Sequence, residues 1–159
     1  MDQPLNKRKV LFLCTGNSAR SQMAEALLRH YAGDFFDVHS AGLEPKGINP
    51  LTIQVMEELG LDLSAHTSKN VQRYIGNTSF DYMITVCAQA EEMCPIFPGM
   101  GVRMHWDIED PSKFNGAPAE KLTKFRQARD RLDHKIRLWL SQQGIPLSQI
   151  ANQAVSVRG

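Results

Sequence analysis

The first third of the chain alternates short apolar runs with longer amphipathic stretches. In chain order, this pattern predicts a strand over 9–13, a helix over 21–31, a strand over 38–41 and a helix over 50–59. Asn49 and Pro50 supply a helix cap and a first-turn proline for the second helix, which ends before Gly60. The apolar run at 10–13 has no alternation, which is typical of a strand buried on both faces.

The rest of the chain continues the alternation and predicts a short helix over 68–75, strands over 82–86 and 102–105, and a long helix over 118–141. Strands that alternate with helices predict an α/β fold with a parallel sheet and right-handed crossovers. Cys14, Cys87 and Asp110 follow the first, third and fourth predicted strands. Because the carboxyl ends of parallel strands share one edge, we expect these three residues to surround one crevice.

Length and charge narrow the class of protein. The 159 residues, 42% of them hydrophobic, predict a single globular domain over residues 1–144 and a polar C-terminal tail over 145–159 whose order the pattern does not determine. A net charge of +1 supplies no basic field for nucleic acid or for an anionic membrane. The N-terminal apolar run is too short for a signal peptide or a membrane span, so we expect a cytoplasmic protein.

A cysteine and an arginine bracket the turn between the first strand and the first helix. Backbone N–H groups in such a turn form a concave nest for an anion, and the following helix adds the positive end of its dipole. We expect a tetrahedral oxyanion to bind there, on Thr15, Gly16, Asn17, Ser18, Ala19 and Arg20. Gly16 and Asn17 tolerate the positive φ that closes the nest, and the Arg20 guanidinium can grip two oxygens. These surroundings favour a Cys14 thiolate, to which Ser21 can donate a hydrogen bond; a buried structural cysteine is the alternative.

Two further cysteines, Cys87 and Cys94, distinguish a reductase from a phosphatase. A phosphatase needs only Cys14, Arg20 and a carboxylic acid, whereas reduction of arsenate by two electrons leaves two thiols as a disulfide. Cys14 and Cys87 can form that disulfide, and Cys94 can move it out of the anion site. The alternatives for Cys87 and Cys94 are two buried cysteines that act only as apolar side chains, or two ligands of a zinc site.

The segment between the last two cysteines favours a helix. Seven residues of helix span ~10 Å, whereas the Cα atoms of a disulfide lie about 4.4–6.8 Å apart. We therefore predict that residues 87–94 unwind on oxidation, helped by the prolines and glycines that follow at Pro95, Pro98, Gly99 and Gly101.

Several motifs together resemble a known family: CTGNSARSQMAE at 14–25, SAG at 40–42, HTS at 66–68, Val86-Cys87, Cys94-Pro95, His105-Trp106 and Asp110-Pro111. From about Val10 to Trp139 the chain is similar to thioredoxin-coupled arsenate reductases of the low-molecular-weight tyrosine phosphatase superfamily. The resemblance implies a flavodoxin-like, low-molecular-weight phosphatase fold, with a four-stranded parallel sheet flanked by helices. It also implies a role in arsenical resistance, by reduction of arsenate to arsenite.

The resemblance further implies a relay of redox-active disulfides. Cys14 attacks arsenate, Cys87 attacks the resulting adduct and releases arsenite as a Cys14–Cys87 disulfide forms, and Cys94 then takes over to give a Cys87–Cys94 disulfide. Thioredoxin reduces that bond, although the sequence by itself leaves a glutaredoxin or a small thiol open as reductant. Arg20 holds the oxyanion, Ser21 supports the thiolate and Asp110 protonates the departing oxygen. Phosphate and sulfate are expected to compete.

One position departs from the family pattern. Some members bind potassium behind the loop through side chains that map to Asn17, Glu25, Ser40 and position 69, which here is Lys69. An ammonium cannot ligate a cation, so we predict that Lys69 replaces the ion by placing its charge near Glu25. We expect neither a metal nor another cofactor.

Two other functions remain as alternatives. One is a low-molecular-weight phosphotyrosine phosphatase, although Ser112, Lys113 and Phe114 lack the adjacent aromatic pair that such enzymes commonly use. The other is a non-enzymatic oxyanion or redox sensor that signals through the segment around Cys87. We also expect a weak phosphatase side activity of an arsenate reductase, because phosphate and arsenate share shape and charge.

Overall fold

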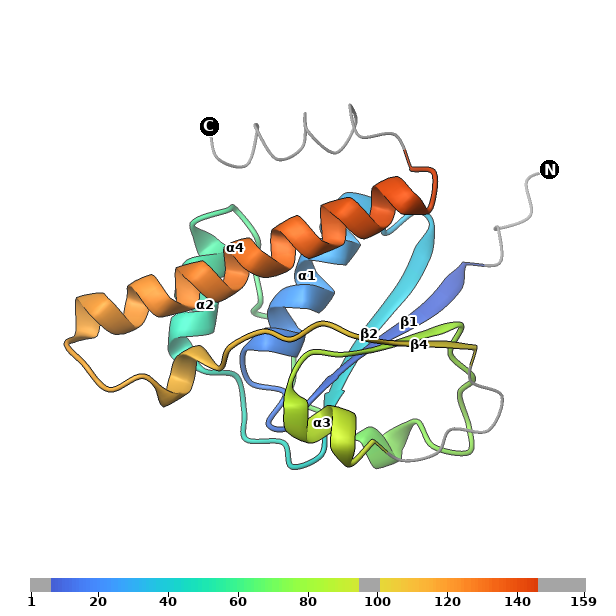
Figure 1. The fold of residues 1–159 in the computed structure, drawn as a ribbon, viewed down its shortest axis with the longest axis horizontal. Coiled ribbons are helices and arrows are strands. Elements are labelled where there is room, and N and C mark those ends of the chain that lie inside the picture. The colour runs from blue at the N-terminus through green and yellow to red at the C-terminus, as the bar shows by residue number, and fades with distance from the viewer. Residues whose placement is uncertain (1–6, 95–100, 146–159) are drawn as a thin grey trace.

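The computed structural model describes residues 7–94 and 101–145, which form a layered α/β domain (Figure 1). Its elements are β1 (Arg8–Cys14), α1 (Arg20–Ala32), β2 (Phe36–Gly42), α2 (Pro50–Glu57), β3 (Tyr82–Thr85), α3 (Ala88–Glu92), β4 (Val102–His105) and α4 (Pro118–Gln142). Two short 3₁₀ turns, η1 (Val71–Arg73) and η2 (Pro111–Lys113), complete them. The alternation of strands and helices confirms the predicted fold class.

Four parallel strands form one sheet within the described residues, in the order β2-β1-β3-β4. The central strand β1 pairs along its whole length with β2, from Arg8 opposite Phe36 to Cys14 opposite Gly42. Its residues Val10 to Leu13 are completely buried, as the unbroken apolar run predicted. All strands therefore end at the same edge, and the chain leaves β1 and β3 there at Cys14 and at Val86-Cys87.

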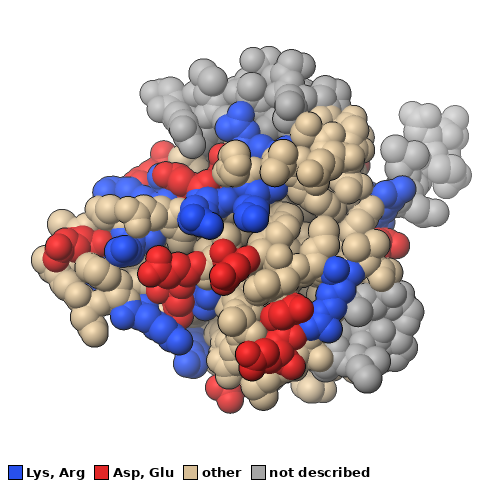
Figure 2. All heavy atoms as spheres, in the orientation of Figure 1, with Lys and Arg blue, Asp and Glu red and all other residues tan. Residues whose placement is uncertain are grey.

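Helices α1, α2 and α4 pack against one another, with α4 running across the other two (Figure 1). The apolar stripe of α4 is buried at Phe125, Ala128, Leu132, Ile136 and Trp139. Arg129 also lies in this interface, where its guanidinium donates 2.8 Å hydrogen bonds to the Val55 carbonyl and to Glu58. Acidic and basic side chains are interspersed over the face that carries α4 (Figure 2), in keeping with the small net charge.

Some predicted boundaries were wrong. The helix expected over 68–75 shrinks to η1, capped by the Asn70 side chain, and Gly76 follows with a φ of 84°. The strand expected over 38–41 is longer, because pairing with β1 recruits Phe36 and Asp37. The tail beyond Ile145 and residues 95–100 lie outside the described residues, so the division into domain and tail stays a prediction. No described helix is long and apolar enough to cross a membrane.

Candidate active site

The loop between β1 and α1 is held from behind by the segment that follows β2. Backbone amides of this strap, residues 43–49, donate to loop carbonyls: Leu43 to Cys14, Glu44 to Thr15, Lys46 to Gly16 and Asn49 to Ser18. Because the N–H and C=O of a trans peptide unit point in opposite directions, the amides that follow these carbonyls point away from the strap. The amide of Asn17 follows this rule and donates to Cys14 Sγ at 3.2 Å. The predicted nest of N–H groups is therefore built into the backbone.

Two residues close this loop tightly. Asn17 has a φ of 48°, so the left-handed conformation predicted for Gly16 and Asn17 is adopted by the asparagine and not by the glycine. Gly42 lies so close to the loop that an added Cβ would stand 2.6 Å from the Thr15 carbonyl oxygen. The loop and the end of β2 can approach this closely only because position 42 has no side chain.

Cys14 lies at the bottom of the loop, 3% exposed, with donors around its sulfur. Ser21 Oγ is 2.9 Å from Cys14 Sγ, and Asn17 Nδ2 donates to the same hydroxyl at 2.8 Å. Since Ser21 Oγ accepts from Asn17, its own hydrogen is free to point at the sulfur. The site therefore presents two donors to Cys14, as a thiolate nucleophile requires.

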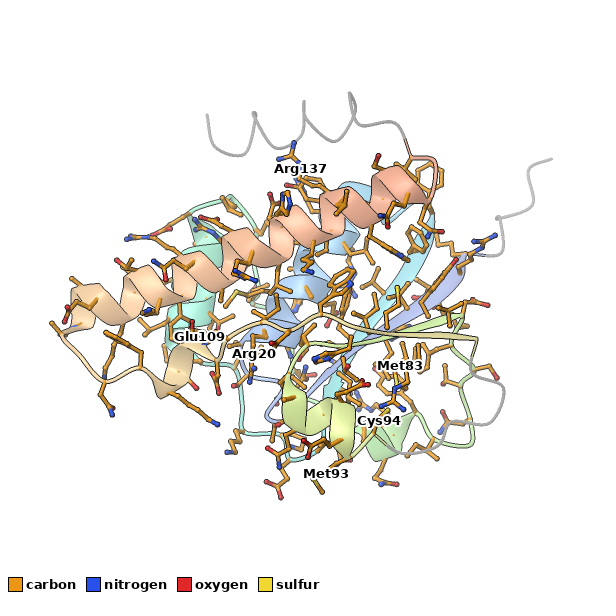
Figure 3. The ribbon with its side chains drawn as sticks, viewed as in Figure 1. Arg20, Met83, Met93, Cys94, Glu109 and Arg137 are labelled. Atoms are coloured by element: carbon orange, nitrogen blue, oxygen red, sulfur yellow. The ribbon has the colours of Figure 1, made fainter. Side chains whose placement is uncertain are left out.

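Arg20 connects the loop to the segment after β4. Its guanidinium donates to the Ile108 carbonyl at 3.0 Å and lies 3.3 Å from Asp110 Oδ2. The other Asp110 oxygen accepts from the backbone and hydroxyl of Ser112. Figure 3 shows Arg20 beside the segment that carries Glu109. These contacts fix the Arg20 side chain at the mouth of the loop, next to the predicted acid.

Cys87 and Asp110 share a cleft with Cys14, as the strand order predicted. The cleft has a volume of about 750 Å³ and is lined by Cys14, Arg20, Cys87, Asp110 and Phe114, among others. Cys87 is buried at the N-terminal end of α3, where its sulfur accepts from the Ala90 amide at 3.3 Å. Thr15 Oγ1 lies 3.4 Å from the same sulfur and links it to the loop.

Cys94 lies apart from this cleft, at the other end of α3. Its thiol donates to Met83 Sδ at 3.1 Å, and Figure 3 shows both residues to the right of α3. Partial burial raises the pKa of the Cys94 thiol. All three cysteines are reduced, and the helix between the last two confirms the helical character expected of residues 87–94. Its unwinding on oxidation stays a prediction.

Asn17, Glu25, Ser40 and Lys69 form one connected group behind the loop, as predicted. Asn17 Oδ1 accepts from the Lys69 amide at 2.8 Å, Asn17 Nδ2 donates to Ser40 Oγ at 3.0 Å, and Ser40 donates to Glu25. Lys69 Nζ lies 3.7 Å from Glu25 Oε1, which confirms the predicted placement of its charge. Burial opposes ionisation of Glu25, but Lys69, Ser40 and Arg29 outweigh it and hold the pKa of Glu25 below its ordinary value.

The sequence did not single out two further residues of this group. Gln22 is buried and donates to the backbone and side chain of Asn17, and its Oε1 lies 2.9 Å from His66 Nδ1. Burial lowers the pKa of His66. In the sequence, the only indication of a role for Gln22 and His66 was that they lie in the motifs at 14–25 and 66–68. Among the described residues, no three His, Cys, Asp or Glu side chains are grouped to hold a metal, and the expectation of no cofactor stays untested.

The chain matches a known family and several known proteins along most of its length. The family described as low molecular weight phosphotyrosine protein phosphatase matches residues 9–153. An arsenate reductase of Halalkalibacterium halodurans is 41% identical over 133 residues, covering 84% of this chain and 95% of the relative. A solved arsenate reductase in its phosphate-binding state superposes with a TM-score of 0.72 and 29% identity, over 85% of this chain and 98% of that one. A thioredoxin-dependent arsenate reductase of Corynebacterium glutamicum has a TM-score of 0.65 and 31% identity, over 89% of this chain and 64% of that one.

Proposed function

Since the chain belongs to the low molecular weight phosphotyrosine protein phosphatase family and its relatives include arsenate reductases, we propose that it reduces arsenate to arsenite by passing a disulfide among three cysteines. One observation carries this proposal. Cys14 and Cys87 line a single cleft with Arg20 and Asp110, whereas Cys94 stands outside it at the far end of α3. A phosphatase has no use for this second and third thiol.

The first half of the reaction uses the cleft. The Cys14 thiolate attacks arsenic(V), held by the loop amides and Arg20, and Asp110 supplies the proton with which one oxygen leaves as water. The Cys87 thiolate then attacks the Cys14 sulfur. The electron pair of the sulfur–arsenic bond goes to arsenic, so arsenite leaves as arsenic(III) and the two thiols become a disulfide. The Ser21 hydroxyl and the Asn17 amide stabilise the thiolate in the first step.

The second half moves the disulfide outward. The Cys94 thiolate attacks Cys87, a Cys87–Cys94 disulfide forms, and Cys14 leaves as a thiolate ready for another arsenate. Thioredoxin is the proposed reductant, in line with the thioredoxin-dependent relative. We place this cycle in the cytoplasm, where thiols are kept reduced. Phosphate and sulfate, as tetrahedral anions, are expected to compete with arsenate for the loop.

A phosphatase side activity follows from the same residues. Cys14, Arg20 and Asp110 suffice for attack on a phosphate ester, and the cleft is far larger than an inorganic oxyanion, so it has room for an organic leaving group. Hydrolysis of an aryl phosphate should therefore proceed slowly and survive loss of Cys87.

The deciding experiment is arsenate-dependent consumption of NADPH with thioredoxin and thioredoxin reductase. We expect turnover in the wild type and none in Cys14→Ser or Cys87→Ser, while Cys94→Ser releases at most one arsenite per enzyme. Aryl phosphate hydrolysis that survives Cys87→Ser, with no arsenate reduction by the wild type, would instead identify a phosphatase. Arsenate or phosphate binding without any turnover would identify a sensor.

A further inference from the structure

The short helix α3 is fastened to the sheet through the side chain of Glu91. The Thr85 hydroxyl donates to Glu91 Oε1 at 2.8 Å, and Arg103 Nη2 lies 3.2 Å from the same oxygen. Arg103 also donates to the Glu91 main-chain carbonyl. Thr85 ends β3 and Arg103 lies in β4, so one residue of α3 is tied to two strands.

A histidine completes this cluster. His105 Nδ1 is 2.8 Å from Thr85 Oγ1. Because the Thr85 hydrogen is given to the Glu91 carboxylate, the hydrogen between Thr85 and His105 must come from His105, which fixes its Nδ1–H tautomer. The Thr85 hydroxyl and the Arg103 guanidinium lower the pKa of Glu91, so the carboxylate is ionised near neutral pH.

The position of the cluster gives it a consequence for the relay. Glu91 lies between Cys87 and Cys94, and the helix it fastens keeps the two sulfurs apart, with Cys87 bonded to the Ala90 amide and Cys94 bonded to Met83. As predicted from the sequence, we expect a disulfide between them to require this helix to open. Opening of α3 would in turn weaken the contacts of Glu91 with Thr85 and Arg103.

We propose that Glu91, Thr85, Arg103 and His105 form a latch that holds α3 in its reduced conformation and thereby slows attack by Cys94 on the Cys87 sulfur of the Cys14–Cys87 disulfide. These are positioning residues, which touch neither the oxyanion nor a reacting sulfur. The latch also protects the resting enzyme against small disulfides such as oxidised glutathione, because a Cys87–Cys94 disulfide closed by such an oxidant would remove the thiol that must attack the arsenic adduct. This inference rests on the proposed function for its place in the cycle, but the latch itself can be tested without arsenate.

The first test uses a small disulfide as oxidant, in a Cys14→Ser background where only Cys87 and Cys94 can pair. Oxidised glutathione takes two electrons from the two thiols, which form one disulfide as two glutathione thiols are released. We expect Glu91→Ala to close this disulfide about fivefold faster than its parent. Arg103→Ala should give a smaller acceleration, and Arg103→Lys, which keeps the ion pair, should stay near the parental rate.

Glu92→Ala is the matched control, since Glu92 is the exposed neighbour on the same helix and no described contact ties it to the sheet. Alanine has a higher helix propensity than glutamate, so a change acting through the helix alone would slow unwinding in both variants. Acceleration in Glu91→Ala but not in Glu92→Ala supports the latch. Equal rates of disulfide closure in the two variants, or a slower rate in Glu91→Ala than in its parent, would overturn it. If Glu91→Ala lowers the urea midpoint of unfolding, Glu91→Gln provides a milder variant for the same measurement.

The second test places the latch in the cycle. Without an external reductant, a single turnover with arsenate should form the Cys14–Cys87 disulfide at the same rate in wild type and Glu91→Ala, and only its conversion to Cys87–Cys94 should accelerate. A merely structural role for Glu91 would change both steps, which would overturn the proposal. If the wild type does not reduce arsenate at all, the proposed function fails while the glutathione test still judges the latch.

Discussion

The ion pair behind the loop gives the sharpest prediction about stability. Lys69 and Glu25 are both largely buried, with side chains 12% and 7% exposed. Replacing Lys69 by methionine keeps the length of the side chain but removes the ammonium from a buried carboxylate and the hydrogen bond that Lys69 donates to the Thr67 carbonyl. Breaking one side of a buried pair costs about 3–5 kcal/mol when the remaining charge is left alone.

Part of that charge remains compensated in Lys69→Met. Arg29 Nη2 stays 2.6 Å from Glu25 Oε2, and Ser40 still donates to the carboxylate. We therefore expect Lys69→Met to lower the free energy of unfolding by about 2 kcal/mol at neutral pH. Urea unfolding of the wild type, Lys69→Met, Glu25→Gln and the double variant measures this as a double-mutant cycle.

The lowered pKa of Glu25 determines how its contribution to the free energy of unfolding changes with pH. The pKa of folded Glu25 is below its ordinary 4.5, so its contribution to stability is fully present above about that pH and is lost as the pH falls through the lowered value. In Lys69→Met, burial is no longer outweighed to the same extent, so the pKa of Glu25 rises. The difference between wild type and variant should then shrink in acid to the part that comes from the lost hydrogen bond to Thr67. An equal cost of Lys69→Met with and without Glu25→Gln, or a cost that does not fall when Glu25 is protonated, would refute the reasoning. Strong dependence of wild-type turnover on potassium over sodium would contradict Lys69 as the replacement of an ion.

Three further predictions concern catalysis. Ser21→Ala removes one donor to Cys14 and should slow the first step by about 10–100-fold with little change in arsenate affinity, measured by single-turnover kinetics; an unchanged rate would count against the donor role. Gly42→Ala forces a Cβ against the Thr15 carbonyl and should weaken phosphate binding at least tenfold by calorimetry, so wild-type affinity would show that the loop tolerates the side chain. Asp110→Asn removes the acid and should lower kcat for arsenate by about 100-fold; retention of full kcat would assign the proton to another group.

Much of the fold followed from local pattern because the pattern and the tertiary contacts agree there. The unbroken apolar run of β1 is buried on both faces, and the stripe of α4 faces the core. The local sequence pattern failed to predict the bounds of elements that are set by hydrogen bonds to other segments. β2 extends to Phe36 because β1 offers seven partners in register, and the helix expected over 68–75 is limited by the bond from the Lys69 amide to Asn17 and by Gly76.

The candidate site was predicted in the same uneven way. Residues that carry the chemistry could be placed from topology alone, because Cys14 and Cys87 stand at strand ends and Arg20 begins the helix that follows the first of these strands. Residues that hold the loop could not, because Gln22 and Gly42 act through buried hydrogen bonds and close approach between segments far apart in sequence. The contact between Cys94 and Met83 belongs to the same class, since no spacing rule brings a thioether to a thiol.

The central claim is that the three sulfurs exchange in order on one oxyanion site. Disulfide mapping by mass spectrometry, on protein treated with arsenate and no external reductant, tests it directly. The account predicts one arsenite released per chain, a disulfide joining Cys87 to Cys94 and a reduced Cys14, with the Cys14–Cys87 disulfide trapped instead in Cys94→Ser. Three thiols that stay reduced after arsenate treatment would contradict it.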